Sequence, residues 1–133
     1  MEFEGEYLNG IRWNGKEYDE EGEIDFEIKE GSGKGKEYSN YDKLKFEGEY
    51  LNGKRNGKGK EYYYNNKLKF EGEYLNGKRN GHGKEYNFGG FLEYEGEYLN
   101  GERNKKGKEY SNGKLKFKGE HLNGIRNRKC QIF

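Results

Sequence analysis

Hydrophobic and polar residues alternate along short stretches of this chain, and each stretch leads into a glycine-containing turn. From Leu44 to Tyr50, the residues Leu, Phe, Gly and Tyr occupy every second position, with Lys and Glu between them. A period of two predicts a β-strand with one face against an apolar surface. Asn52-Gly53 and Asn56-Gly57 then predict a turn, because Asn and Gly tolerate positive φ. A second strand is expected from Lys58 to Tyr64.

Helical signals are missing from the sequence. No segment shows a sustained period of 3.6 residues with capping residues, and the chain contains 23 glycines in 133 residues. Glycine at this density opposes helix formation. The sequence therefore predicts an all-β chain.

The strand, turn and strand pattern is repeated along the chain. The stretch from Phe70 to Tyr86 recurs with one substitution from Phe46 to Tyr62, and with more changes from Tyr94 to Tyr110. A fixed period indicates a repeat protein, in which each unit packs against its neighbours. We expect one array over residues 1–133, with units that start near residues 3, 26, 46, 70, 94 and 117.

Two units depart from the pattern. The second unit, from Phe26 to Tyr38, lacks four residues of the central loop, so a tighter hairpin is expected there. The sixth unit has Arg128 and Cys130 where inner units have glycine. Terminal repeats are commonly atypical, and we expect the sixth unit to be a C-terminal cap.

The register of one hairpin can be proposed from favourable cross-strand pairs. We expect Tyr50 to face Gly59 and Phe46 to face Tyr63, which places an aromatic ring over a glycine and joins two aromatic residues. In this register the closing tyrosine of the unit, Tyr62, falls on the charged face. Either a bulge at the Gly-Lys-Gly segment shifts the register, or both faces carry aromatic side chains.

The repeated unit resembles the MORN repeat. It combines an aromatic-x-Gly-x-aromatic strand, as at Phe70 to Tyr74, with a glycine-containing turn and a Gly-x-Gly second strand, as at Gly81 to Gly83. The resemblance implies one β-hairpin per repeat, stacked edge to edge. The expected fold is an elongated, single-layer, twisted antiparallel sheet of about six hairpins. It also implies a scaffold, or an array attached to an enzyme.

Composition supports an ordered and nearly neutral protein. The net charge is +1 and 17% of residues are aromatic, which favours order despite the 38% of charged residues. A neutral balance gives no general attraction to nucleic acid, and none is expected as a partner. The single cysteine, the start of the chain and the absence of a long apolar run make a cytoplasmic protein the expectation, peripheral to a membrane if it binds lipid.

Candidate catalytic and metal-binding residues are few. Gly31 to Lys36 resembles a phosphate-binding loop, but the hydroxyl residue and the following helix of that motif are missing. His82 and His121 have no second ligand at metal-binding spacing. We expect no catalytic residue, no metal and no cofactor, and an enzyme is the least favoured class of function.

One arginine recurs beside the turn in five of the six units. Stacked repeats would align these residues along one sheet edge, where Arg suits bidentate contacts with an acidic segment or anionic lipid headgroups. The alternative is that each arginine bonds to its own loop carbonyls or is merely solvated. The members of this predicted arginine row are Arg12, Arg55, Arg79, Arg103 and Arg126.

The favoured function is a non-catalytic scaffold or adaptor that binds a protein partner through the aromatic residues of the sheet. Self-association is a variant of this hypothesis, and a peripheral membrane module that binds anionic phospholipids through turn Arg and Lys is the alternative. The tyrosines predicted to contact the partner are Tyr50, Tyr62, Tyr74, Tyr86, Tyr98 and Tyr110.

Overall fold

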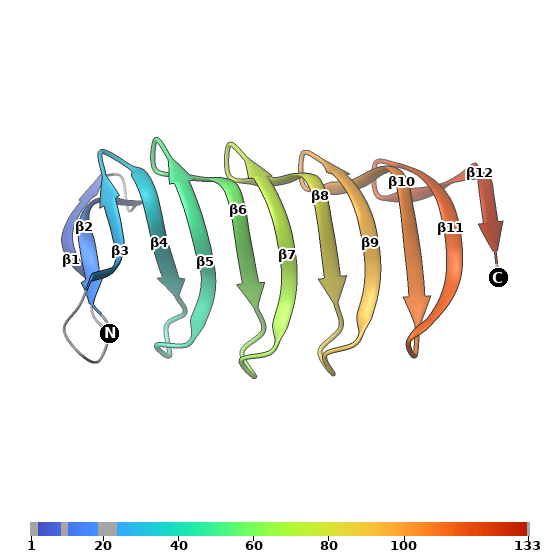
Figure 1. Cartoon of the computed structure of the whole chain (residues 1–133), viewed down its shortest axis with the longest axis horizontal. Coiled ribbons are helices and arrows are strands. Elements are labelled where there is room, and N and C mark those ends of the chain that lie inside the picture. Colours follow the sequence, from blue (N-terminus) through green and yellow to red (C-terminus); the bar gives the residue numbers. More distant parts are fainter. Residues whose placement is uncertain (1–2, 9–10, 19–23, 133) are drawn as a thin grey trace.

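The chain forms a single antiparallel sheet of twelve strands, in which every strand pairs with its neighbours in sequence (Figure 1). The computed structural model describes residues 3–8, 11–18 and 24–132, and the side chains of residues 5, 15, 16 and 27–126. The strands are β1 (Phe3–Leu8), β2 (Ile11–Tyr18), β3 (Ile24–Lys29), β4 (Ser32–Tyr38), β5 (Leu44–Leu51), β6 (Lys54–Tyr62), β7 (Leu68–Leu75), β8 (Lys78–Tyr86), β9 (Leu92–Leu99), β10 (Glu102–Ser111), β11 (Lys114–Leu122) and β12 (Ile125–Ile132).

The sheet is elongated and twisted, and its two ends lie at opposite ends of the long axis (Figure 1). All described residues belong to strands, turns or irregular segments, and none is helical. The prediction of an all-β, single-layer sheet of stacked hairpins is confirmed. This architecture aligns equivalent residues of successive hairpins along the sheet, two strand spacings or roughly 10 Å apart.

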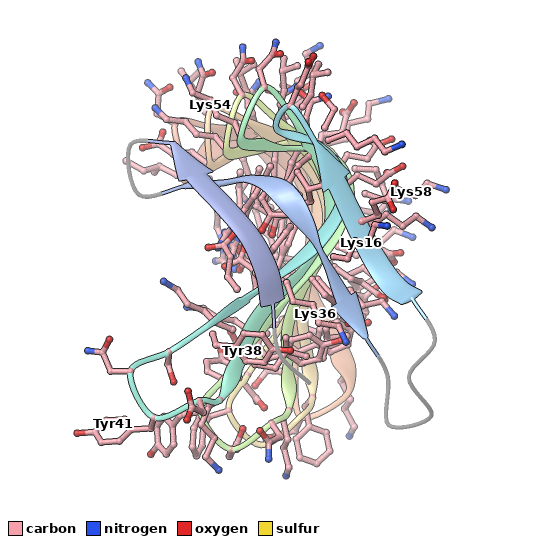
Figure 2. All side chains as sticks on the ribbon, turned by 90° about the vertical axis from the view of Figure 1, so that its left-hand side faces the viewer. Lys16, Lys36, Tyr38, Tyr41, Lys54 and Lys58 are labelled. Carbon is pink, nitrogen blue, oxygen red and sulfur yellow. The ribbon has the colours of Figure 1, made fainter. Side chains whose placement is uncertain are left out.

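The turns gather along two opposite edges of the sheet. Asn-Gly pairs form turns within hairpins, as at Asn52 and Gly53, which adopt φ values of 51° and 78°. Consecutive positive φ values define a type I′ turn, whose twist suits a tight hairpin. Lys54 beside this turn and Tyr41 in a turn between hairpins lie at opposite ends of the strands (Figure 2).

The register of β5 with β6 differs from the register expected from the sequence. Phe46 pairs with Glu61 and Tyr50 pairs with Arg55, so the expected Phe46–Tyr63 and Tyr50–Gly59 pairs are wrong. The cause is the tight turn at Asn52-Gly53: β6 begins at Lys54 and not at the expected Lys58, so Asn56-Gly57 lies within the strand. A register shift between Gly48 and Tyr50 then leaves additional residues of β6 unmatched.

A glycine and a carboxylate stabilise the irregularity. Gly57 adopts a φ of 94°, a conformation that residues with a side chain rarely adopt. The backbone N–H of Lys58 donates a hydrogen bond to Glu49 Oε2 at 2.6 Å. The side chain thus replaces a backbone partner that the shifted ladder no longer supplies.

Ring contacts form the core, although the sheet has only one layer. The Phe46 side chain is fully buried and lies against Gly59, where an added Cβ would come within 2.6 Å of the ring. The same ring meets Tyr50 and Tyr74 edge to face, with centroids 5.8 Å and 5.2 Å apart. Equivalent rings continue this row through the later hairpins. The fully buried members are Phe46, Phe70, Tyr94 and Phe117.

We call the face that carries these rings the inward face, and the opposite one the outward face. Side chains alternate between the two faces along each strand. Glu47, Glu49 and Leu51 therefore lie on the outward face. Lys16 and Lys58 project from the convex side of the curved strands (Figure 2).

The second hairpin is shorter than the others. Strands β3 and β4 pair only through Ile28 with Gly33 and Lys29 with Ser32. Ile28 is 1% exposed, and its side chain covers Gly35 in the way that Phe46 covers Gly59. The turn at Glu30-Gly31 has two residues with φ values of 51° and 78°, the same as Asn52-Gly53. The four missing residues thus shorten the paired strands and not the turn, without interrupting the buried row.

Candidate functional site

Four of the five predicted arginines lie in one row on the inward face. The Arg79 guanidinium lies 4.1 Å from the centre of the Phe70 ring. Its Nε donates to Glu61 Oε2 at 2.9 Å and its Nη1 donates to Glu85 Oε1 at 3.1 Å. The contact with Glu61 joins this hairpin to the preceding one, whereas Glu85 lies on the same strand as Arg79. Equivalent Arg–Glu pairs are Arg55–Glu37, Arg103–Glu85 and Arg126–Glu109.

These contacts change the interpretation of the arginine row. Arg55, Arg79 and Arg103 bond to glutamate carboxylates and not to loop carbonyls, and none of the three is a solvated charge at the sheet edge. The Arg79 side chain is only 18% exposed, whereas Arg126 is 45% exposed. The Arg12 side chain lies outside the described residues. Binding of an anionic partner by this row stays a prediction, and such a partner would compete with carboxylates already in place.

The Glu61 carboxylate of this row is held in the charged form. Burial raises the pKa of Glu61, but hydrogen bonds from Arg79 and Tyr74 and the nearby guanidinium charges outweigh burial, so the net pKa lies below 4.5. The Tyr74 hydroxyl donates to Glu61, and burial together with this carboxylate raises the tyrosine pKa. A buried network with satisfied charges fixes one arrangement of its members, and losing one partner is costly.

The six predicted tyrosines fall into two rows on opposite faces. Tyr50, Tyr74 and Tyr98 belong to the inward core and are 8%, 4% and 4% exposed. Tyr62 and Tyr86 lie on the outward face, where their hydroxyls donate to Glu47 at 2.6 Å and to Glu71 at 3.0 Å. The structure therefore does not bring the six together as one surface. The outward row consists of Tyr62, Tyr86 and Tyr110, all partly exposed.

The outward face carries an open trough whose floor is the backbone of paired glycines. Gly48, Gly59 and Gly72 contribute to its floor. A second stretch of the same kind continues past Gly96 and Gly107. The strand backbones are accessible between the charged rows, because a side chain at these positions would point to the inward face, as an added Cβ at Gly59 points to the Phe46 ring. We call this feature the glycine trough.

From β5 to β10, charge alternates from strand to strand along the glycine trough. The strands β5, β7 and β9 contribute two glutamates each, and β6, β8 and β10 contribute basic residues or histidine. For example, Lys84 Nζ on β8 lies 3.7 Å from Glu95 Oε2 on the neighbouring strand β9. The acidic lining residues are Glu47, Glu49, Glu71, Glu73, Glu95 and Glu97, and the facing residues are Lys58, Lys60, His82, Lys84, Lys106 and Lys108.

A row of exposed leucines runs beside the glycine trough. Each lies at the end of the first strand of its hairpin, next to the turn, and they are about half exposed. Sequence reasoning missed this row, although the same alternation that buries Tyr50 places the next residue on the outward face. The members of this leucine row are Leu51, Leu75, Leu99 and Leu122.

Exposed aromatic residues also gather at the turns between hairpins. Tyr41 is 88% exposed and Tyr64 is 75% exposed. The Phe88 ring lies 5.4 Å from the Tyr63 ring and 5.0 Å from the Tyr64 ring. These residues do not stand out in the sequence, because the turns between hairpins differ from one unit to the next.

The histidines have structural surroundings. His121 replaces the tyrosine of the inward row and is 3% exposed. Its Nε2 lies 2.9 Å from Glu109 Oε2, while its Nδ1 is buried without a hydrogen-bond partner. Within the described residues, no group of three His, Cys, Asp or Glu is arranged to hold a metal ion.

The part of the chain that the structure describes contains no helix that is long and apolar enough to cross a bilayer.

Comparison with known families gives one match. The family model described as MORN repeat matches residues 46–67, 70–87 and 94–115. These ranges correspond to the hairpins β5–β6, β7–β8 and β9–β10. No curated protein matches the chain.

Proposed function

The chain belongs to the MORN repeat family, and from this premise we propose that it is a non-catalytic scaffold that holds a protein partner on its outward face. MORN repeats are typically non-catalytic and commonly mediate interactions with proteins or membranes. Repeat arrays of this kind offer extended binding surfaces, because each unit presents the same groups at a fixed interval.

The observation that carries this proposal is that the inward face is occupied by contacts between hairpins, whereas the outward face is exposed. On the inward face, the rings and the Arg–Glu pairs contact one another, so that Phe70 is fully buried and Arg79 is 18% exposed. On the outward face, the glycine trough, the leucine row and the tyrosine row are open to a partner. An uncovered apolar row rimmed by polar groups is typical of an interaction surface.

An anionic membrane surface bound through the turn arginines is the less favoured candidate. Arg55 and Arg79 each make two contacts with carboxylates of the preceding hairpin. A phosphate group would have to displace these carboxylates and disturb the contacts between hairpins. Sedimentation with phosphatidylserine vesicles tests this candidate directly: binding that is lost in an Arg55→Glu and Arg79→Glu variant shown to be folded by circular dichroism would favour it.

Photo-crosslinking from defined positions tests the proposed scaffold function. A photoreactive phenylalanine analogue placed at Leu75 probes the outward face, and the same group at Lys43 probes the edge with the turns between hairpins. In an extract of the source cell, we expect one discrete crosslinked protein from position 75 and none from position 43. Equal or absent crosslinking from both positions would overturn the proposal.

A further inference from the structure

The chemistry of the glycine trough restricts the shape of the partner. Along the sheet, acidic and basic strands alternate at ~4.8 Å, so the complete charge pattern repeats after ~9.6 Å. A complementary partner must present a basic group over β5, an acidic group over β6 and a basic group over β7. It must therefore place opposite charges on one side, ~5 Å apart, and repeat them about every 10 Å.

Extended partners do not satisfy this condition when they lie along the trough. A β-strand presents side chains to one side every second residue, or every ~6.7 Å, which matches neither distance. A polyproline II helix turns once in ~9.3 Å and three residues, so it presents only one residue per repeat to the trough. A polyproline II helix therefore matches the ~9.6 Å charge period but cannot place both a basic and an acidic residue in each period.

An α-helix satisfies both distances. Residues three or four positions apart lie on one face of a helix, separated by ~4.5 to ~6 Å along the axis. A seven-residue repeat advances ~10.5 Å, close to the ~9.6 Å spacing of successive hairpins. Over three repeats the difference accumulates to only ~3 Å, less than one strand spacing.

The leucine row supplies the apolar part of the same interface. Leu51, Leu75 and Leu99 are 49%, 51% and 49% exposed and recur once per hairpin. A helix with a seven-residue repeat can direct one apolar side chain to each leucine while its charged flank lies over the trough. Apolar contact would contribute affinity, and the charge pattern would set the orientation and register of the helix.

Resting on the proposed scaffold function, we propose that the outward face binds an amphipathic α-helix with a seven-residue repeat, whose Lys or Arg and Glu or Asp residues lie three or four positions apart. The helix lies along the long axis, across the strands, with its apolar stripe on the leucine row. Three hairpins, β5 to β10, accommodate about three repeats, or ~21 residues.

Synthetic helices test this inference. A fluorescein-labelled peptide of three identical seven-residue repeats, each with one Leu, one Glu and one Lys at the stated spacing, is titrated with the full chain and followed by fluorescence anisotropy. A second peptide has Glu and Lys exchanged in the middle repeat only, which keeps composition and helicity but breaks the charge period. A third peptide, rich in proline, carries Leu at every third residue.

We expect the first peptide to bind about tenfold more tightly than the second, and the proline-rich peptide to bind weakly or not at all. Equal affinity for the first two peptides, tighter binding of the third, or no binding of any peptide would overturn the inference. A protein crosslinked at Leu75 without peptide binding would refute the helical partner alone. Absence of any crosslinked protein would refute the scaffold function itself.

Charge variants identify the face that binds. The Lys58→Glu and Lys60→Glu double variant should lose about tenfold in affinity for the first peptide, since two trough charges change sign. The Lys43→Glu and Lys114→Glu variant, with the same charge change at the turns between hairpins, should bind as the unaltered chain does. If circular dichroism shows that the first variant is unfolded, Lys106→Glu and Lys108→Glu replaces it. Equal affinities for trough and control variants would overturn the inference.

Discussion

At the scale of single residues, the molecule depends on a ring, a guanidinium and a carboxylate contributed by adjacent hairpins. Phe70 supplies the ring, Arg79 stacks on it and Glu61 binds the guanidinium from the preceding hairpin. The arginine thus offsets the loss of hydration of a buried carboxylate and covers apolar surface with its stem. This arrangement explains why an arginine recurs at the same position without forming a free cationic surface.

Replacing the arginine with lysine tests this role. Arg79→Lys keeps the charge but removes the planar group that stacks on Phe70 and binds two carboxylates, so we expect a loss of about 2 kcal/mol of unfolding free energy. Arg126→Lys is the matched control, because that side chain is 45% exposed. It should cost less than about 0.5 kcal/mol in urea unfolding. Equal losses in the two variants would contradict the account.

The same carboxylates make stability depend on pH. The pKa values of Glu37 and Glu61 are lower in the folded chain than the usual 4.5: burial raises them, and the contacts of their arginines and tyrosines outweigh burial. Their contribution to stability is therefore complete above pH 4.5 and is lost as the pH falls through the lower folded-state values. Urea unfolding from neutral pH down to about pH 3 should show this decline. A Glu61→Gln variant with an unchanged acid dependence would refute it.

The replacement of a row tyrosine by His121 leaves a correctable defect. The buried Nδ1 atom has no hydrogen-bond partner. His121→Tyr would restore the hydroxyl that binds the carboxylate in other hairpins, as Tyr74 binds Glu61. We expect a gain of about 1 kcal/mol in unfolding free energy. A loss of stability would show that the pocket between the Tyr94 and Phe117 rings does not admit the larger side chain.

At the scale of the hairpin, paired glycines allow the rings to approach the backbone. An added Cβ at Gly59 would lie 2.6 Å from atoms of the Phe46 ring and 3.0 Å from Tyr74. An added Cβ at Gly101 would have no atom within 4 Å apart from its chain neighbours, so only the φ of 89° opposes a side chain there. The two positions separate the steric role of glycine from its conformational role.

Alanine substitutions measure the two roles. Gly59→Ala should cost about 2 kcal/mol or more, because the ring cannot move away without leaving the buried row. Gly101→Ala should cost about 1 kcal/mol, the strain of a positive φ. Thermal unfolding of both variants provides the comparison. A Gly59→Ala variant as stable as the Gly101→Ala variant would contradict the packing described for the core.

The hairpins also show which structural features can be predicted from the sequence and which cannot. The alternation from Leu44 to Tyr50 and the Asn-Gly turns predict the strands and their order, because both signals are local. The register failed because the turn is confined to Asn52-Gly53 and β6 begins at Lys54, so Asn56-Gly57 lies in the strand and not in a turn. The Arg79–Glu61 pair lies 18 residues apart in sequence and joins β8 to β6 across β7, a contact that no local signal predicts.

The two alternatives for the closing tyrosine are both present in the structure. The hairpin contains a register shift, and both faces carry aromatic side chains, with Tyr50 inward and Tyr62 outward. The six candidate tyrosines were predicted by recurrence, which does not separate residues that pack from residues that face a partner. Leu51, by contrast, could have been identified from the alternation, since it directly follows the buried Tyr50.

At the scale of the whole molecule, the sheet stabilises itself through one face and leaves the other open. Successive hairpins are joined by hydrogen-bonded strands, by the ring row and by the Arg–Glu pairs. None of these contacts uses the leucine row. Changes to the leucine row should therefore leave the fold intact, which makes binding and stability experimentally separable.

The central claim is that the outward face binds and the inward face holds the fold. The most direct measurement is made on a Leu51→Ser, Leu75→Ser and Leu99→Ser triple variant. Thermal unfolding and the affinity for the first peptide, with its three identical seven-residue repeats, are recorded on the same sample. We predict an unfolding temperature close to that of the unaltered chain and an affinity at least tenfold weaker. A folded triple variant that binds the peptide with unchanged affinity would contradict the account.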